Sequence, residues 1–328
     1  MLSDSSRRTS RRALVAFASA TLAANVGVVL WGAYVRVTGS GAGCGNHWPL
    51  CDGTVIPHTQ HIQTLIEFTH RVTSGIALLT VMGLWIWTRA VMPRKQLARY
   101  AAAAAALLIV SEAVLGASLV LFEHVAQDRS ASRAVWLALH STNTMLLLGA
   151  IALTAFWAAK PACSLLPWSR PYAARLGTLL LVLIVAATGA VTALGDTLFP
   201  ASSLRTAVAQ DFSSSSYYVL RLRIFHPLMA LLAVMTLSWV LAALPDSPNK
   251  LLRRPAAAVT VVLFLQLMLG GLNVVLLAPV WLQILHLFVA DVLWISLVLL
   301  AAESLTPGVH SARAFRVLGC EPARSSVT

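Results

Sequence analysis

The sequence predicts an all-α integral membrane protein whose eight transmembrane helices form two pseudo-symmetric four-helix bundles. Of its 328 residues, 58% are hydrophobic and only 11% are charged, whereas soluble domains carry roughly 25% charged residues. Eight apolar stretches are long enough to cross roughly 30 Å of hydrocarbon as helices of about 20 residues each. Short motifs also recur about 155 residues apart, and this spacing indicates an internal duplication.

The eight expected helices follow one another with short connections. They cover residues 13–35, 63–88, 100–122, 134–158, 173–194, 219–243, 256–278 and 280–302. The lipid bilayer is therefore the first predicted partner of this chain.

The repeated motifs divide the chain into similar halves. Three motifs of the first half match three of the second: WGAYVRVTG with TGAVTALG, EAVLGASLV with QLMLGGLNV, and EFTHR with RIFHP. We expect an N-terminal half at residues 1–160, a C-terminal half at 161–302 and a tail at 303–328. Each half has two helices in each direction, so the repeats are parallel and a pseudo-two-fold axis along the membrane normal is expected.

The distribution of Lys and Arg predicts the orientation, because cytoplasmic loops keep positive charge. With the N-terminus inside, 17 of the 24 Lys and Arg lie on the inner side. This places both termini in the cytoplasm and the protein in the cell membrane. The net charge of +12 is then mainly a topology signal, and no nucleic acid partner is needed to explain it. A cleaved signal peptide at RRTSRRALVAFASATLAA (7–24) is a weaker alternative, since the apolar run continues past Trp31.

The predicted orientation puts the loop of residues 36–62 outside, where disulfides persist. Cys44 and Cys51 are its only cysteines, and we expect them to be bridged. A static staple, a redox role and an unbridged pair all remain open, as does a metal site shared with His47. Cys163 and Cys320 fall on the inner side, where thiols stay reduced.

Four histidines are the main candidates for chemistry. They fall on the second, fourth, sixth and eighth expected helices, six to eight residues after each helix begins, and so at about the same depth; they are His70, His140, His226 and His286. Two imidazoles facing each other inside a helical bundle commonly hold haem iron from both sides. Zinc would need a third or fourth donor, and none repeats with the histidines. No CxxCH motif is present, which excludes covalent c-type haem.

The halves differ three residues before the first histidine of each pair. Glu67 precedes His70, whereas Arg223 precedes His226. An arginine suits a haem propionate through charge-assisted hydrogen bonds, whereas a carboxylate in a membrane is costly unless it has a purpose. We therefore expect a resident cofactor in the second half and a reaction in the first. A salt bridge between Glu67 and Arg71 is the alternative role for this carboxylate.

These residues resemble those of the haem A synthase family. The resemblance is carried by GAYVRVTGSGAGCGNHWPLCDGTVIP (32–57), TLIEFTHR (64–71), His140, RIFHP (223–227) and ILHLF (284–288), and it extends over all eight helices. The cysteine pair matches the branch of the family with a disulfide in its first outer loop.

The resemblance implies that a ring methyl of haem O is oxidised to a formyl group, giving haem A for terminal oxidases. It implies haem b as the cofactor, held by His226 and His286, and haem O as the substrate, held by His70 and His140 with Glu67 as the essential carboxylate. Haem O synthase is the expected supplier of substrate, and the electron donor stays unassigned.

Two acidic residues are left without a firm role. Glu112, whose counterpart in the second half is Gln266, either hydrogen-bonds within the first site or relays protons, and Asp291, which follows His286 on the last helix, is expected to pair with a neighbouring polar group. Two other function classes also remain open. A di-haem electron-transfer subunit would need the same four histidines, and a haem-binding assembly or transport protein would bind haem without changing it.

Overall fold

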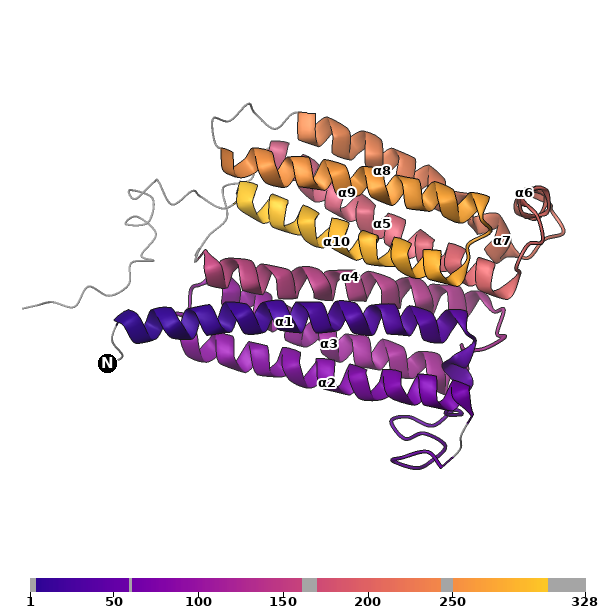
Figure 1. Cartoon of the computed structure of the whole chain (residues 1–328), viewed down its shortest axis with the longest axis horizontal. Coiled ribbons are helices and arrows are strands. Elements are labelled where there is room, and N and C mark those ends of the chain that lie inside the picture. The colour runs from indigo at the N-terminus through magenta and orange to yellow at the C-terminus, as the bar shows by residue number, and fades with distance from the viewer. Residues whose placement is uncertain (1–3, 59–60, 161–169, 243–249, 306–328) are drawn as a thin grey trace, which may run out of the picture.

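The computed structural model describes residues 4–58, 61–160, 170–242 and 250–305 (Figure 1). Within these ranges it is helical without a named strand, and eight of its helical segments are long and apolar enough to cross a membrane. The predicted all-α fold with eight candidate membrane spans is therefore confirmed. The helices are α1 (Asp4–Val37), α2 (Ile62–Val91), α3 (Leu97–Leu121), α4 (Ala131–Ala159), α5 (Arg170–Leu198), α6 (Leu204–Phe212), α7 (Tyr218–Leu222), α8 (Phe225–Ala242), α9 (Lys250–Val275) and α10 (Val280–Leu305).

The long helices lie roughly side by side and alternate in direction (Figure 1). The segment between α1 and α2, residues 38–61, is called the cysteine loop here. It lies at the same end of the molecule as α6 and α7, and this end is called the loop end. The start of α1 and the end of α10 both lie at the opposite end. This arrangement agrees with an even number of membrane crossings.

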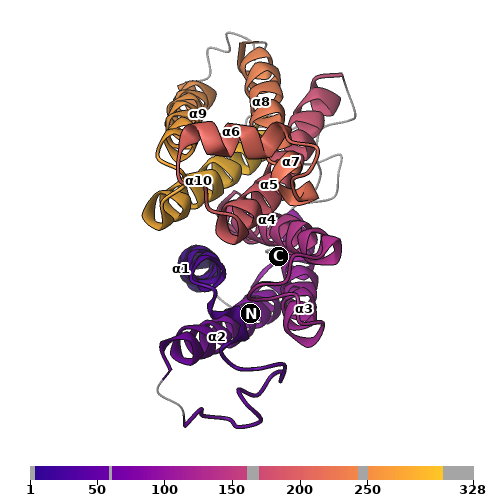
Figure 2. The ribbon, with the colours of Figure 1, turned by 90° about the vertical axis from the view of Figure 1, so that its right-hand side faces the viewer.

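Viewed from the loop end, α1 to α4 form one group and α5 to α10 another (Figure 2). Helix α4 packs against both α5 and α10 and so carries much of the contact between the groups. Trp294 of α10 donates its indole N–H to the carbonyl of Met145 on α4 at 2.5 Å. Its ring lies over Gly149, where an added Cβ would be 3.3 Å from the indole nitrogen. At the opposite end, Lys160 and Glu303 form an ion pair of 2.5 Å across the same boundary.

The sixth expected helix is interrupted, which corrects the prediction of one continuous helix over residues 219–243. Helix α7 ends at Leu222 and α8 begins at Phe225. Pro227 explains the break, because a proline has no N–H to donate and its ring clashes with the carbonyl four residues earlier, which here is that of Arg223. The two pieces still form one candidate membrane span, Tyr218–Ala242.

Helix α6 was missed by the sequence reasoning, which treated residues 195–218 as an outer loop. Ser203 caps this helix by accepting the N–H of Thr206 at 3.2 Å. Leu204, Val208 and Phe212 follow at four-residue spacing, all exposed. A capping serine before such a spacing is a recognisable helix signal. Hydropathy did not reveal this helix, because it lies outside the candidate membrane spans.

Candidate functional site

Each of the four histidines packs against a glycine on a neighbouring helix. A Cβ added to Gly32 would lie 3.0 Å from the His70 ring, and one added to Gly189 would lie 2.9 Å from the His226 ring. In the same way, Gly116 lies against His140 at 3.7 Å and Gly270 against His286 at 3.3 Å. The first helix of each pair thus supplies a glycine and the second a histidine, in both halves of the chain.

The second-half histidines face each other at a distance that suits one iron atom. The ring centres of His226 and His286 lie 6.4 Å apart with the planes at 88°. Two imidazoles on one iron have their ring centres roughly 6 Å apart, because each metal–nitrogen bond is about 2 Å and each nitrogen lies about 1.2 Å from its ring centre. The residues present therefore fit a haem held between paired imidazoles.

Several ring nitrogens of the four histidines make no hydrogen bond in the described part of the chain, a condition that a metal-binding nitrogen must meet. His226 Nδ1 lies 3.1 Å from the carbonyl of Val185. An Nδ1–H donated there leaves Nε2 free for a metal, the arrangement usual for metal-binding histidines. Within the described residues, the Nδ1 atoms of His70, His140 and His286 are buried without a hydrogen-bond partner. All four side chains are partly exposed, so a ligand can reach them.

Glu67 is held between Arg71 and the cysteine loop. Its Oε1 accepts from Arg71 Nη2 at 2.5 Å and Nε at 3.1 Å, and its Oε2 accepts the Cys44 N–H at 2.8 Å. Arg71 Nη1 also donates to the loop carbonyls of His47 and Leu50, both at 2.6 Å. The salt bridge weighed as an alternative role is therefore present. These contacts connect the loop to the helix that carries His70.

Cys44 and Cys51 form a disulfide, as expected, and both are buried. The loop packs tightly on the start of α2, because a Cβ on Gly43 would lie 2.5 Å from the backbone of Gln63. Only glycine fits at that position. The expectation of free thiols at Cys163 and Cys320 falls outside the described residues.

Arg223 is buried and already paired with two carboxylates. Its Nη1 lies 2.8 Å from Asp196 Oδ1, and its Nη2 lies 2.7 Å from Asp211 Oδ1. Arg36 of α1 reaches the same region and donates to the carbonyl of Ala193 at 2.6 Å. Sequence reasoning missed both aspartates, because α6, which carries Asp211, was not expected. These charges gather at the loop end of the second half.

Glu112 lies directly beside His140. Its Oε1 is 3.6 Å from His140 Nδ1, and its oxygens accept from Asn143 Nδ2 at 2.5 Å and from the Thr144 hydroxyl. Asp291 is fully buried, and both of its oxygens lack a partner among the described residues. The structure thus joins Glu112 to the first site, whereas the pairing suggested for Asp291 is not seen there.

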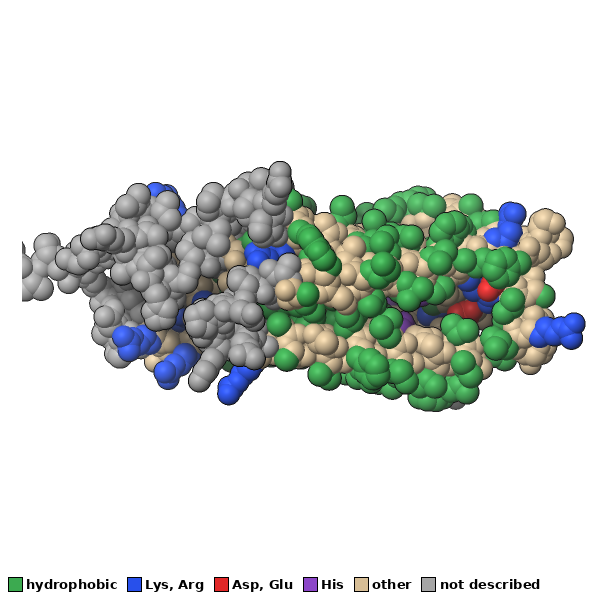
Figure 3. Space-filling view, turned by 90° about the horizontal axis from the view of Figure 1, so that it is seen from above, with side chains coloured by type: hydrophobic (Ala, Val, Ile, Leu, Met, Phe, Trp, Pro, Cys, Tyr) green, Lys and Arg blue, Asp and Glu red, His purple; other side chains and the backbone are tan. Residues whose placement is uncertain are grey.

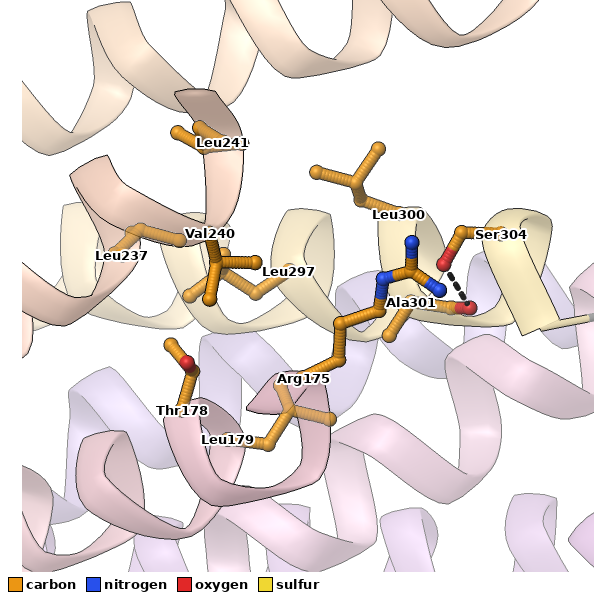
Figure 4. A pocket seen from close by; sticks show the side chains of 10 residues that line it. All are labelled: Arg175, Thr178, Leu179, Leu237, Val240, Leu241, Leu297, Leu300, Ala301 and Ser304. Atoms are coloured by element: carbon orange, nitrogen blue, oxygen red, sulfur yellow. Dashed lines mark hydrogen bonds between the residues drawn. The ribbon is translucent and has the colours of Figure 1, made fainter. Parts of the chain in front are cut away.

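A group of ionisable side chains lies among the hydrophobic side chains on the side of the molecule that Figure 3 shows. Figure 3 shows histidine, acidic and basic side chains in a hollow between hydrophobic helices. A separate pocket lies near the opposite end and is lined by ten side chains from α5, α8 and α10 (Figure 4). Arg175 is its single ionisable residue, and no histidine lines it. The pocket therefore offers no iron ligand, and the candidate site is the histidine region.

Comparison with known proteins identifies relatives of the whole membrane domain. Residues 15–298 match the COX15-CtaA family, described as cytochrome oxidase assembly protein. A protoheme IX farnesyltransferase of Thermus thermophilus is 44% identical over 299 residues, which are 90% of this chain and 49% of the relative. This chain therefore spans about half the length of that relative.

Two shorter matches carry another name. Heme A synthase of Alkalihalophilus pseudofirmus is 40% identical over 128 residues, covering 38% of this chain and 40% of the relative. Heme A synthase of Halalkalibacterium halodurans is 39% identical over 113 residues, covering 34% and 37%. Because the family match extends over nearly all the membrane-spanning helices, the chain belongs to the COX15-CtaA family of cytochrome oxidase assembly proteins.

Proposed function

We propose that this protein is a haem A synthase, an oxidoreductase that converts the ring methyl of haem O to the formyl group of haem A. The observation that carries the proposal is the repeated contact of a histidine with a glycine of a neighbouring helix, which occurs twice in each half. Membership of the family and the relatives named heme A synthase support it. A conduit or carrier for haem would need the same imidazoles, so the test must detect conversion of the porphyrin.

The two halves have different roles in this proposal. The N-terminal half, residues 1–160, takes haem O between His70 and His140. The C-terminal half, residues 161–302, holds haem b between His226 and His286, where the 6.4 Å ring separation supports it. When bound, haem b supplies one-electron transfer. Arg223, which is paired with Asp196 and Asp211 in the structure, is the proposed partner of a haem b propionate.

Conversion of a methyl to a formyl group removes four electrons, two in each of two hydroxylations, and an external oxidant must accept them. In the proposed sequence two C–H bonds are hydroxylated in turn and the resulting geminal diol loses water. The chain contributes by fixing the substrate ring at His70 and His140. Glu67 contributes a charge near that ring, held in place by Arg71, and such preorganised charge is usually a large catalytic term.

The setting of the reaction follows from the membrane topology. We propose the cell membrane as its location, with both termini in the cytoplasm and the cysteine loop outside. A farnesyltransferase acting on protohaem is the proposed supplier of haem O. The relative of that name is about twice the length of this chain and matches it over one part, which is the expected pattern when two consecutive activities are joined in one protein.

The proposal is tested by the porphyrin that appears in membranes. The chain is expressed together with a haem O source, and extracted haems are separated by chromatography and identified by mass. We expect haem A in these membranes, and none from the haem O source alone. Haem O left unchanged by abundant, folded protein would contradict the proposal and favour a carrier or an electron-transfer subunit.

Glycine at position 189 gives a test of the haem b site that does not depend on conversion. In Gly189→Ala the new methyl would lie 2.9 Å from His226, and a ring fixed by iron cannot move away. We expect the haem b content of the purified protein to fall about tenfold or more, in line with other disturbed metal ligands. Gly177→Ala on the same helix is the matched control, because nothing lies within 4 Å of its added Cβ. Haem b content in Gly189→Ala as high as in Gly177→Ala would contradict the assignment of His226 as a haem b ligand.

A further inference from the structure

Glu112 and Gln266 occupy corresponding places in the two halves. Each stands four residues before the glycine that contacts a histidine, Gly116 on α3 and Gly270 on α9. Glu112 Oε1 lies 3.6 Å from His140 Nδ1, and Gln266 Nε2 lies 3.2 Å from His286 Nε2. The two histidines therefore have different neighbours, a carboxylate in the first half and a neutral amide in the second.

The polar surroundings of Glu112 are also confined to the first half. Asn143 and Thr144, three and four residues after His140, both donate to Glu112. The Ser111 hydroxyl donates to Asn143 Oδ1 at 2.6 Å, which fixes the amide. In the second half the residues three and four after His286 are Val289 and Ala290, and no equivalent network can form there. A polar network inside a membrane-spanning segment is costly unless it serves a purpose.

The hydrogen-bond donors around Glu112 leave room for one more donor to its carboxylate, and His140 is the neighbouring candidate. Asn143 and Thr144 both approach with N–H or O–H groups, which match the oxygens of a carboxylate. His140 Nδ1 is buried and has no hydrogen bond, although it lies 3.6 Å from Glu112 Oε1. That separation exceeds a hydrogen bond, and a small rotation of the partly exposed ring toward the carboxylate closes it.

We propose that Glu112 is a positioning residue that accepts the Nδ1–H of His140 and makes His140 a more electron-donating iron ligand than His286. The proposal rests on the proposed binding of a haem between His70 and His140. A carboxylate behind a metal-bound histidine fixes the tautomer and raises the basicity of the ligand. A more basic ligand stabilises ferric over ferrous iron, so the two halves hold iron of different reduction potential.

The two isosteric exchanges test this directly. The purified full-length protein is loaded with iron protoporphyrin IX, and the potential at each site is measured by spectroscopic redox titration. His140→Ala and His286→Ala assign the signals to the halves. In Glu112→Gln we expect the ferrous-to-ferric ratio of the N-terminal iron to rise about tenfold at fixed potential, equal to about 59 mV for one electron. The C-terminal iron is expected to keep its potential in that variant. Gln266→Glu is the matched exchange in the second half; its side chain approaches His286 Nε2 and not Nδ1, so the N-terminal iron is expected to keep its potential there.

The outcomes separate this proposal from the proposed function. Iron bound at both sites with potentials that neither exchange alters would overturn the role of Glu112 and leave the haem sites standing. If wild-type protein binds no iron porphyrin that depends on His70 and His140, both proposals fail. Glu112→Asp, which keeps the charge but shortens the reach toward His140 Nδ1, provides a second measurement if Glu112→Gln does not fold. A shift in the same direction as that expected for Glu112→Gln, but smaller, is expected, and an N-terminal potential equal to that of the wild type in a variant that no longer contacts His140 would overturn the role of Glu112.

Discussion

Replacement of Glu67 by Gln is expected to lower haem A formation about 100-fold or more, the usual cost of removing one preorganised catalytic group. The amide has nearly the volume of the carboxylate but no charge. It also has one oxygen in place of two, whereas Arg71 and the Cys44 N–H both donate to Glu67. Haem b should remain, because its proposed ligands lie on α8 and α10. Chromatography of extracted haems measures both quantities in one sample.

Arg71→Gln separates the two roles that Glu67 can have. This variant removes the donors to His47 and Leu50 and so weakens the attachment of the cysteine loop, but it keeps the carboxylate. If the charge of Glu67 acts on the substrate, Arg71→Gln retains more activity than Glu67→Gln. Equal losses would assign Glu67 to holding the loop. Near-normal haem A formation by Glu67→Gln would show that neither role matters for conversion.

Replacement of His226 or His286 by Ala is expected to reduce the low-spin haem b spectrum at least about tenfold. Each change removes one of the two imidazoles whose ring centres lie 6.4 Å apart. His140→Ala should leave most of that spectrum, because His140 belongs to the other half. The measurement is the reduced-minus-oxidised spectrum of purified protein at equal protein concentration.

His124→Ala is the control for loss of an imidazole in general. His124 lies in the connection between α3 and α4 and pairs with Asp128 at 2.9 Å. Its removal should not change the haem b spectrum. If the spectrum depends on His70 and His140 and survives loss of His286, the assignment of cofactor and substrate to the halves is reversed.

The course of the chain through the membrane could be predicted because hydropathy alone determines it. Every helix spanning the bilayer must be long and apolar, and each of the eight expected stretches corresponds to a candidate membrane span in the structure, the sixth as two helical pieces. The break before α8 was also available in principle from Pro227, but the long apolar run that follows this proline dominates the hydropathy of the stretch. Helix α6 lies outside the spans, where hydropathy gives no signal.

The candidate site was predictable in its histidines and less so in its charges. His70 and His226 stand in repeated motifs, and the structure places each of the four histidines against a glycine of a neighbouring helix. Partners of Glu67 and Arg223 depend on how distant segments fold back. The Cys44 N–H reaches Glu67 from a loop, and Asp196 and Asp211 reach Arg223 from two other helices. Spacing along one helix cannot reveal such contacts.

The central claim is that the four histidines hold two irons, one in each half of the chain. X-ray anomalous scattering at the iron edge, from crystals of protein isolated together with haem O, tests it most directly. We expect two peaks, one between His70 and His140 and one between His226 and His286. A single peak shared by the halves, or iron bound away from these imidazoles, would contradict the account.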